Sequence, residues 1–255
     1  MLKKNRHRWA FLIIVTWLST LCVSAQISVG AKASVLQNQF TQPGSIIGFS
    51  AGAYASYQVL PFAKLKIEPQ YAQLGGGRQS YYVDYSSIDA NVSAIGFYNP
   101  SVLMHTVEVP LLAELTLPEF EDETIVPKLI VGGSYSLMIK ATESSTMRYF
   151  FNDGTPSVDV GYRHQNVTDN YARSQFGVVV GFGVLFKTDS RDFQFDVRYR
   201  QGLTQVNRIK YPDAIQVGSS SSSSPTSPGI PANGVGGNLY TSSLSINFSM
   251  TIFNF

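Results

Sequence analysis

Residues 106–140 read TVEVPLLAELTLPEFEDETIVPKLIVGGSYSLMIK, and the pattern in this stretch sets the expectation for the whole chain. Apolar residues recur at every second position from Val107 to Leu115, and again from Leu129 to Ile139. Charged and small residues occupy the opposite parity. A period of two is typical of strands with one apolar and one polar face. Each arm is about ten residues long, which is the length that a tilted strand needs to cross a bilayer. The stretch therefore predicts a transmembrane β-hairpin.

The composition of the chain favours an all-β membrane protein. Of its 255 residues, 44% are hydrophobic and only 14% are charged, whereas a typical soluble domain has about 25% charged residues. Four of the 19 basic residues lie between Lys3 and Arg8, in a segment that we expect to be removed. The remaining 15 basic and 17 acidic residues give the mature chain a net charge near −2. No basic patch is interleaved with aromatic residues, so nucleic acid is not an expected partner.

Residues 1–25 are predicted to be a signal peptide and residues 26–255 a single barrel domain. A basic start is followed by the apolar run 9–18 and by Val23-Ser24-Ala25, which fits cleavage after Ala25. One alternative is a membrane anchor, but the run is shorter than the roughly 20 residues that a spanning helix needs. The other is a lipoprotein modified at Cys22, but Leu21, the residue before it, has the wrong size for a lipobox. Cleavage removes the only cysteine, and with it any thiol chemistry.

Alternation of the same kind recurs along the mature chain and predicts eight strands. The expected strands are 27–35, 47–57, 64–74, 106–115, 128–140, 176–186, 193–200 and 240–255. Long loops, expected at 75–100, 141–173 and 202–238, alternate with short turns, as in bacterial outer-membrane barrels, and the even count leaves both termini in the periplasm. The predicted fold class is an all-β, eight-stranded antiparallel up-and-down transmembrane β-barrel. Residues 148–162 can fold as a hairpin on top of the barrel, and a stable hairpin there would allow ten strands.

Two irregularities are expected within these strands. Pro69 cannot donate a ladder hydrogen bond, so a bulge is predicted there. Phe253 and Phe255 share parity with the polar residues of the last strand, which predicts a terminal bulge or a frayed end.

Two motifs carry a family resemblance. Val107-Glu108-Val109-Pro110-Leu111 is followed by the glycine-rich partner Leu129-Ile130-Val131-Gly132-Gly133. With the export signal and eight strands, the chain resembles the PorT-like outer-membrane β-barrel family of Bacteroidetes over nearly all of its mature length. The resemblance implies a barrel without assigned activity, or an accessory component of the Bacteroidetes (type IX) protein-secretion machinery.

The inward parity carries the candidate site, a barrel-interior charge network. Its predicted members are Lys32, Lys66, Glu68, Glu108, Glu114, Lys128, Lys140, Asp196, Arg198 and Arg200, and Lys64 shares their parity. An eight-stranded barrel has room inside for side chains and little else. We therefore expect opposite charges to pair into a plug, with Glu108 contacting Arg198 or Lys66. The alternative is a narrow ion path or a ligand pocket.

Residues that could support catalysis or metal binding are sparse. Of the three histidines only His105 and His164 follow the signal segment, the first on the outward face near the outer rim and the second in a loop beside Asp169. No Gly-x-Ser-x-Gly motif is present. We therefore predict no catalytic residues, no metal site and no cofactor. A soluble lipocalin-type barrel would have its apolar face inside and charged residues outside. This sequence has too few charged residues for that arrangement, so a lipid-facing apolar side is favoured.

The predicted protein is a non-enzymatic integral outer-membrane barrel with long extracellular loops, acting as a structural or adhesive element or a minor pore. The alternatives are the secretion role and a barrel that binds a small ligand or acts on lipid. The expected partners are the outer-membrane bilayer, the outer-membrane assembly machinery, and a protein bound at the loops or at the acidic periplasmic turn 119–123.

Overall fold

The computed structural model describes residues 26–84, 89–117, 120, 124–208 and 238–255. The predicted signal peptide, most of the acidic turn and the serine-rich part of the third predicted loop lie outside these residues. The strands are β1 (Ile27–Phe40), β2 (Ser45–Leu60), β3 (Ala63–Ile67), β4 (Gln70–Gly77), β5 (Tyr81–Asp84), β6 (Val92–Thr116), β7 (Ile125–Phe151), β8 (Val158–Asn166), β9 (Ser174–Phe186), β10 (Phe193–Gly202) and β11 (Thr241–Asn254). A short 3₁₀ helix, η3 (Thr168–Asn170), precedes β9. Within the described part of the chain, no helix is both long and apolar enough to cross a membrane.

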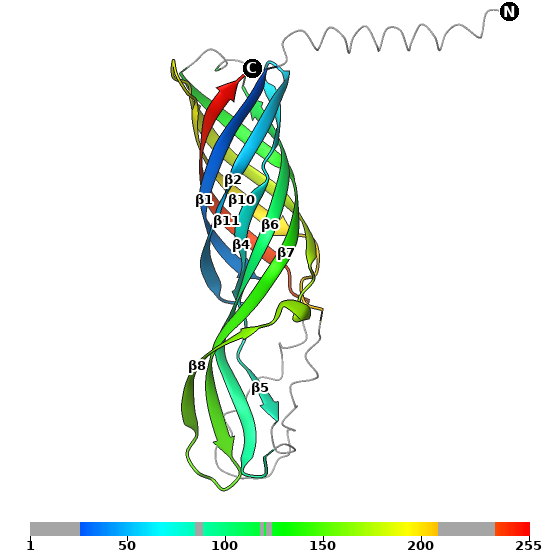
Figure 1. The fold of residues 1–255 in the computed structure, drawn as a ribbon, viewed down its shortest axis with the longest axis vertical. Coiled ribbons are helices and arrows are strands. Elements are labelled where there is room, and N and C mark those ends of the chain that lie inside the picture. Colours follow the sequence, from blue (N-terminus) through cyan, green and yellow to red (C-terminus); the bar gives the residue numbers. More distant parts are fainter. Residues whose placement is uncertain (1–25, 85–88, 118–119, 121–123, 209–237) are drawn as a thin grey trace, which may run out of the picture.

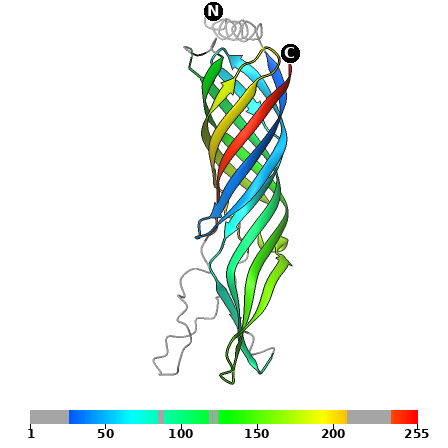
Figure 2. The same cartoon turned by 90° about the vertical axis from the view of Figure 1, so that its left-hand side faces the viewer.

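The strands close into a ring with eight antiparallel strand positions, one of which β3 and β4 share (Figures 1 and 2). The order around the ring is β1, β2, β3 with β4, β6, β7, β9, β10 and β11. β11 pairs back onto β1, from Ser28 opposite Asn254 to Phe40 opposite Thr241, and this seam completes the ring. The predicted fold class is confirmed, with eight strands in the ring rather than ten.

Burial along the strands shows which face points outward. In β1 buried and more exposed residues alternate without interruption, and the pattern recurs in β9 and β11. The exposed parity is apolar, with Ile47 79%, Phe182 66% and Ile246 64% exposed. The buried parity is mainly polar. This is the reverse of a soluble protein, and it is the arrangement of a barrel whose outer wall faces lipid.

The predicted bulge at Pro69 is wrong. Ile67 pairs with Leu111 and Gln70 with Glu108, so two residues intervene on each strand and none is extra. Only the regular strand assignment is interrupted, because proline lacks the N–H that the ladder needs. The Pro69 carbonyl still accepts a hydrogen bond, at 3.1 Å, from the backbone of β2.

The bulge predicted at the C-terminal end is confirmed. Val29 pairs with Phe253 and Gly30 with Thr251, so Ile252 is the extra residue of β11. Ile252 and Phe253 are consequently both exposed although they are adjacent in sequence.

Two predicted loops are largely strand. β6 and β7 run for 25 and 27 residues, well past the end of the ring, and β5 and β8 pair with their outer parts. The hairpin predicted on top of the barrel at 148–162 is confirmed as the β7–β8 pairing, and it lies beyond the ring. The strands of residues 81–84, 92–100, 142–151 and 158–166 form a sheet that we call the extension (Figure 1). It projects from the end of the barrel opposite the two described chain ends (Figure 2). The connection between the predicted strands 27–35 and 47–57 shortens to residues 41–44, because β1 continues to Phe40 and β2 begins at Ser45.

Candidate functional site

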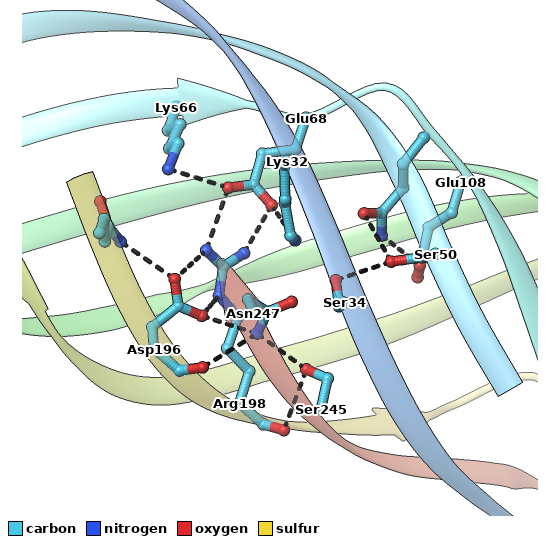
Figure 3. Close-up of polar contacts among 12 residues, drawn as sticks. Lys32, Ser34, Ser50, Lys66, Glu68, Glu108, Asp196, Arg198, Ser245 and Asn247 are labelled. Carbon is cyan, nitrogen blue, oxygen red and sulfur yellow. Dashed lines mark hydrogen bonds and ion pairs between the residues drawn. The ribbon is translucent and has the colours of Figure 1, made fainter. Parts of the chain in front are cut away.

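The centre of the barrel interior is built around Glu68, whose side chain is fully buried. Its carboxylate lies 2.7 Å from Lys32 Nζ and 3.2 Å from Lys66 Nζ, and it accepts two hydrogen bonds from Arg198, at 2.5 and 3.1 Å. Arg198 also donates to Asp196 at 2.5 Å. Figure 3 shows these groups converging from strands on opposite sides of the ring. The Glu68 carboxylate thus forms ion pairs with three cations, and one of them, Arg198, is also paired with Asp196.

A second group lies toward the short turns. Glu114 accepts hydrogen bonds from Lys66 at 3.1 Å, from Lys128 at 2.8 Å and from Gln194 at 3.0 Å. Lys66 therefore bridges Glu68 and Glu114, and its ammonium also lies 4.1 Å from the centre of the Tyr54 ring. This bridge makes the two groups one continuous set of ion pairs.

A third group lies toward the extension, around Glu108 and Arg200. The Arg200 Nε lies 2.7 Å from Glu108, and the guanidinium also donates to Ser134, Ser136 and Thr241 at 2.9 to 3.1 Å. Glu108 accepts a further hydrogen bond from Gln70. The expectation that Glu108 pairs with Arg198 or Lys66 is wrong, because both of those cations are held by Glu68.

Nine of the ten predicted network residues come together in the interior, each no more than 6% exposed. We call them the interior network; its members are Lys32, Lys66, Glu68, Glu108, Glu114, Lys128, Asp196, Arg198 and Arg200. Five bases face four acids, which is closer to balance than the predicted set. Buried charges are tolerated only when they are paired in this way.

Lys140 is the predicted member that does not join. Met104 pairs with Ala141, His105 with Lys140 and Thr106 with Met138, so Ile139 is an extra residue in β7. Ile139 and Lys140 are both exposed as a result. The bulge reverses the parity that alternation predicts. Lys64, which shares the inward parity, is only half-buried.

An apolar cluster covers the interior network on the side of the extension. Thr241 donates to Gln175, whose amide in turn lies 3.7 Å from the Met104 sulfur, so the two layers are in contact. The cluster is buried and is formed by Phe40, Leu74, Val102, Met104, Met138, Ala141, Val167, Tyr171, Val206 and Leu239. Its members come from both sides of the ring and from the segments that return to it around Tyr171, Val206 and Leu239. The barrel interior is therefore filled by charge at its centre and by hydrocarbon at this end.

Sequence reasoning missed a buried ion pair at the base of the extension. The Arg78 guanidinium lies 3.0 Å from Glu143, which also accepts hydrogen bonds from Tyr81 at 2.7 Å and Gln165 at 3.3 Å. Arg78 donates to Tyr171 of the apolar cluster as well. Alternation continues past residue 140, but the bulge at Ile139 shifts its phase. Parity counted from the preceding hairpin therefore assigns Glu143 to the outward face.

The two histidines lie on different surfaces. His164 belongs to β8, not to a loop, and its Nδ1 is 2.7 Å from Ser144 Oγ on an exposed surface. His105 lies on the outward face at the end of the ring, as predicted, with its Nδ1 2.5 Å from Tyr71 Oη. Among the described residues, no three acidic, histidine or cysteine side chains are grouped as metal ligands would be.

These features define an integral outer-membrane β-barrel with a filled interior. A family model described as "Outer membrane protein beta-barrel domain" matches residues 21–208, and the chain belongs to this family. The protein is accordingly located in the outer membrane. A comparison with curated proteins gave no match.

Several solved outer-membrane proteins are similar in structure at low identity. Neisserial surface protein A is 13% identical, with a TM-score of 0.39, over 90% of this chain and 99% of that one. Ail, the attachment invasion locus protein of Yersinia pestis, is 10% identical, with a TM-score of 0.38, over 90% and 100%. The outer membrane enzyme PagL is 12% identical, with a TM-score of 0.39, over 86% and 98%.

Proposed function

We propose that this protein is a non-enzymatic, non-conducting barrel that presents the extension outside the cell as an adhesive or structural surface. The observation that carries the proposal is the combination of a filled interior with a sheet that continues beyond the ring. Long segments of outer-membrane barrels face outward and short turns face the periplasm, which supports an extracellular position for the extension.

The filled interior argues against the predicted alternative of a minor pore. An ion entering from the extension side would have to cross the apolar cluster, where Val102 and Met104 are fully buried and carry no charged group. Beyond the apolar cluster, the ion would reach charged side chains that are already ion-paired, such as Arg200 with Glu108. Conduction would require both layers to rearrange.

The extension has the properties of a binding surface. Every residue of β8 except Gln165 is exposed. β8 lies at the end of the strand order, and among the described residues no strand pairs with its second edge. Val158, Val160 and Tyr162 are each at least 50% exposed. Exposed strand edges of this kind are templates for pairing with another chain.

Two measurements test the proposal. In planar bilayers, we expect the purified protein to give no stepwise currents. In a cell-binding assay, a variant with residues 149–160 replaced by Asn-Gly should lose attachment, while alanines at Thr188, Asp189 and Ser190 in a short turn should leave it unchanged. A heat-modifiability gel confirms that each barrel is folded. Stepwise currents from the native protein, or full attachment by the shortened variant, would overturn the proposal.

The other predicted roles rest on narrower grounds. PorT-like identity and accessory work in protein secretion rest on the motif resemblance, and co-purification of secretion components from native membranes would support them. For a lipid-acting barrel, Ser144 and His164 are the nearest approach to a catalytic pair, but within the described chain no carboxylate contacts His164 to orient it.

A further inference from the structure

We propose that His105 and Lys140 form a binding site for the phosphate group of an outer-leaflet lipid, on the outward face of the barrel where the extension begins. The proposal uses the orientation assigned above but does not depend on adhesion. It starts from the bulge at Ile139, which places a lysine on the lipid-facing side of β7 directly opposite a histidine of β6.

The location matches the level of lipid head groups. The outward apolar residues of β6 and β7 include Val107, Leu137 and Ile139, each more than 40% exposed, and they end at this point. Aromatic side chains lie at the same end of the wall, where the rings of Phe49 and Tyr71 pack in a tilted arrangement with their centroids 5.6 Å apart. Such aromatic girdles mark the boundary between hydrocarbon and head groups.

A hydrogen-bond chain fixes the orientation of the histidine ring. Gln73 Nε2 donates to Tyr71 Oη at 3.3 Å, and Tyr71 Oη lies 2.5 Å from His105 Nδ1. When the Tyr71 hydroxyl donates its proton to Nδ1, the imidazole carries a proton on Nε2. Tyr71 is thus a positioning residue that leaves an N–H donor on the far side of the ring.

Lys140 supplies the charge. Residues directly opposite on neighbouring strands have Cβ atoms about 5 Å apart, so the ammonium and the imidazole can reach the same anion. Lys140 is exposed, and in the part of the chain that the structure describes no carboxylate lies within ion-pair distance of it. The nearby acid Asp169, on η3, instead faces Arg173 at 3.8 Å. A phosphate oxygen would complete a site that already offers one cation and one N–H donor.

The test measures lipid binding by the full-length protein in neutral detergent, using native mass spectrometry. The probes are bisphosphorylated lipid A, the same lipid after enzymatic removal of its phosphates, and inorganic phosphate as a competitor. The variants are Lys140→Gln, His105→Gln and the double variant, with Lys187→Gln at the opposite end of the barrel as the matched control. Tyr71→Phe tests the positioning step without removing either ligand.

We expect Lys140→Gln to weaken binding of the phosphorylated lipid about fivefold, which corresponds to one cation near an anionic surface. The double variant should lose more, Tyr71→Phe should weaken binding in part, and Lys187→Gln should match the native protein. Equal binding of the dephosphorylated lipid, or an unchanged double variant that is folded by gel shift, would overturn the proposal. Displacement by millimolar inorganic phosphate would overturn the lipid as the source while identifying a free-phosphate site.

Discussion

Replacing Glu68 with glutamine removes the charge that holds the centre of the interior together. Lys66 would keep its ion pair with Glu114 and Arg198 its ion pair with Asp196, whereas Lys32 would lose the ion pair that it makes with Glu68. Removing one partner of a buried ion pair costs about 3–5 kcal/mol, because the remaining charge is buried without compensation. Glu68 is fully buried, so water cannot take its place, and we expect a loss in this range.

Glu108→Gln is the matched control within the same barrel. Glu108 compensates a single cation, Arg200, which keeps its hydrogen bonds to Ser134, Ser136 and Thr241. We therefore expect a smaller loss of about 1–3 kcal/mol.

The assay is reversible urea unfolding of the purified barrel in lipid vesicles, followed by the fluorescence of its tyrosines and by gel shift. A Lys32→Met change removes the cation that loses its ion pair and should restore part of the loss in Glu68→Gln. The coupling between the two sites should be about 0.5–3 kcal/mol in a double-mutant cycle. If Glu68→Gln unfolds within about 0.5 kcal/mol of the native protein, or costs less than Glu108→Gln, the reasoning is refuted.

Three further predictions concern other parts of the molecule. A Cβ at Gly52 would lie 2.3 Å from a backbone carbonyl oxygen between β3 and β4, so Gly52→Ala should destabilise the ring by about 1–3 kcal/mol in the same urea assay. Glu143→Gln removes the ion pair between Glu143 and the buried Arg78, and hydrogen exchange should accelerate in the extension while the ring stays protected. Hydrogen bonds from Arg148 lower the pKa of Asp159 below its ordinary value. The ionised Asp159 therefore stabilises the β7–β8 hairpin above the pKa that this carboxyl has in the unfolded chain. The stabilisation is lost as the pH falls through the lower pKa of the folded state, and faster cleavage of the hairpin by pepsin should show that loss.

Alternation predicted the inward side of most strands because a period of two persists wherever no residue is inserted. It placed Glu68 and Arg198 correctly although they are 130 positions apart. It failed at Lys140 because Ile139 is an extra residue that fits either face by its chemistry, so nothing in the local pattern reveals it. The bulge at Ile252 was predictable because Phe253 would otherwise have pointed into a polar interior.

The pairing inside the ring could not be predicted from parity. Strands in a barrel are tilted and staggered, and the stagger decides which inward residues are level with one another. Glu108 therefore contacts Arg200 and not its neighbour on the same face, Arg198. The extension was predicted only in part. Its hairpin at 148–162 was expected, but the strand that leads to it was not, because it is rich in residues such as Ser144, Ser145 and Thr146 that are common in loops.

The seam between β1 and β11 has a consequence for how the protein reaches its folded state. Its partners are more than 200 positions apart in the sequence. Closing the ring therefore costs more loop-closure entropy than forming the hairpins between strands that are neighbours in the sequence. Until the last strand arrives, β1 exposes a row of unpaired backbone groups that can pair with other chains. We therefore expect the hairpins to form first and the seam last. The slow step in biogenesis is then the meeting of the first strand with the last, and an assembly factor would be needed most at that edge.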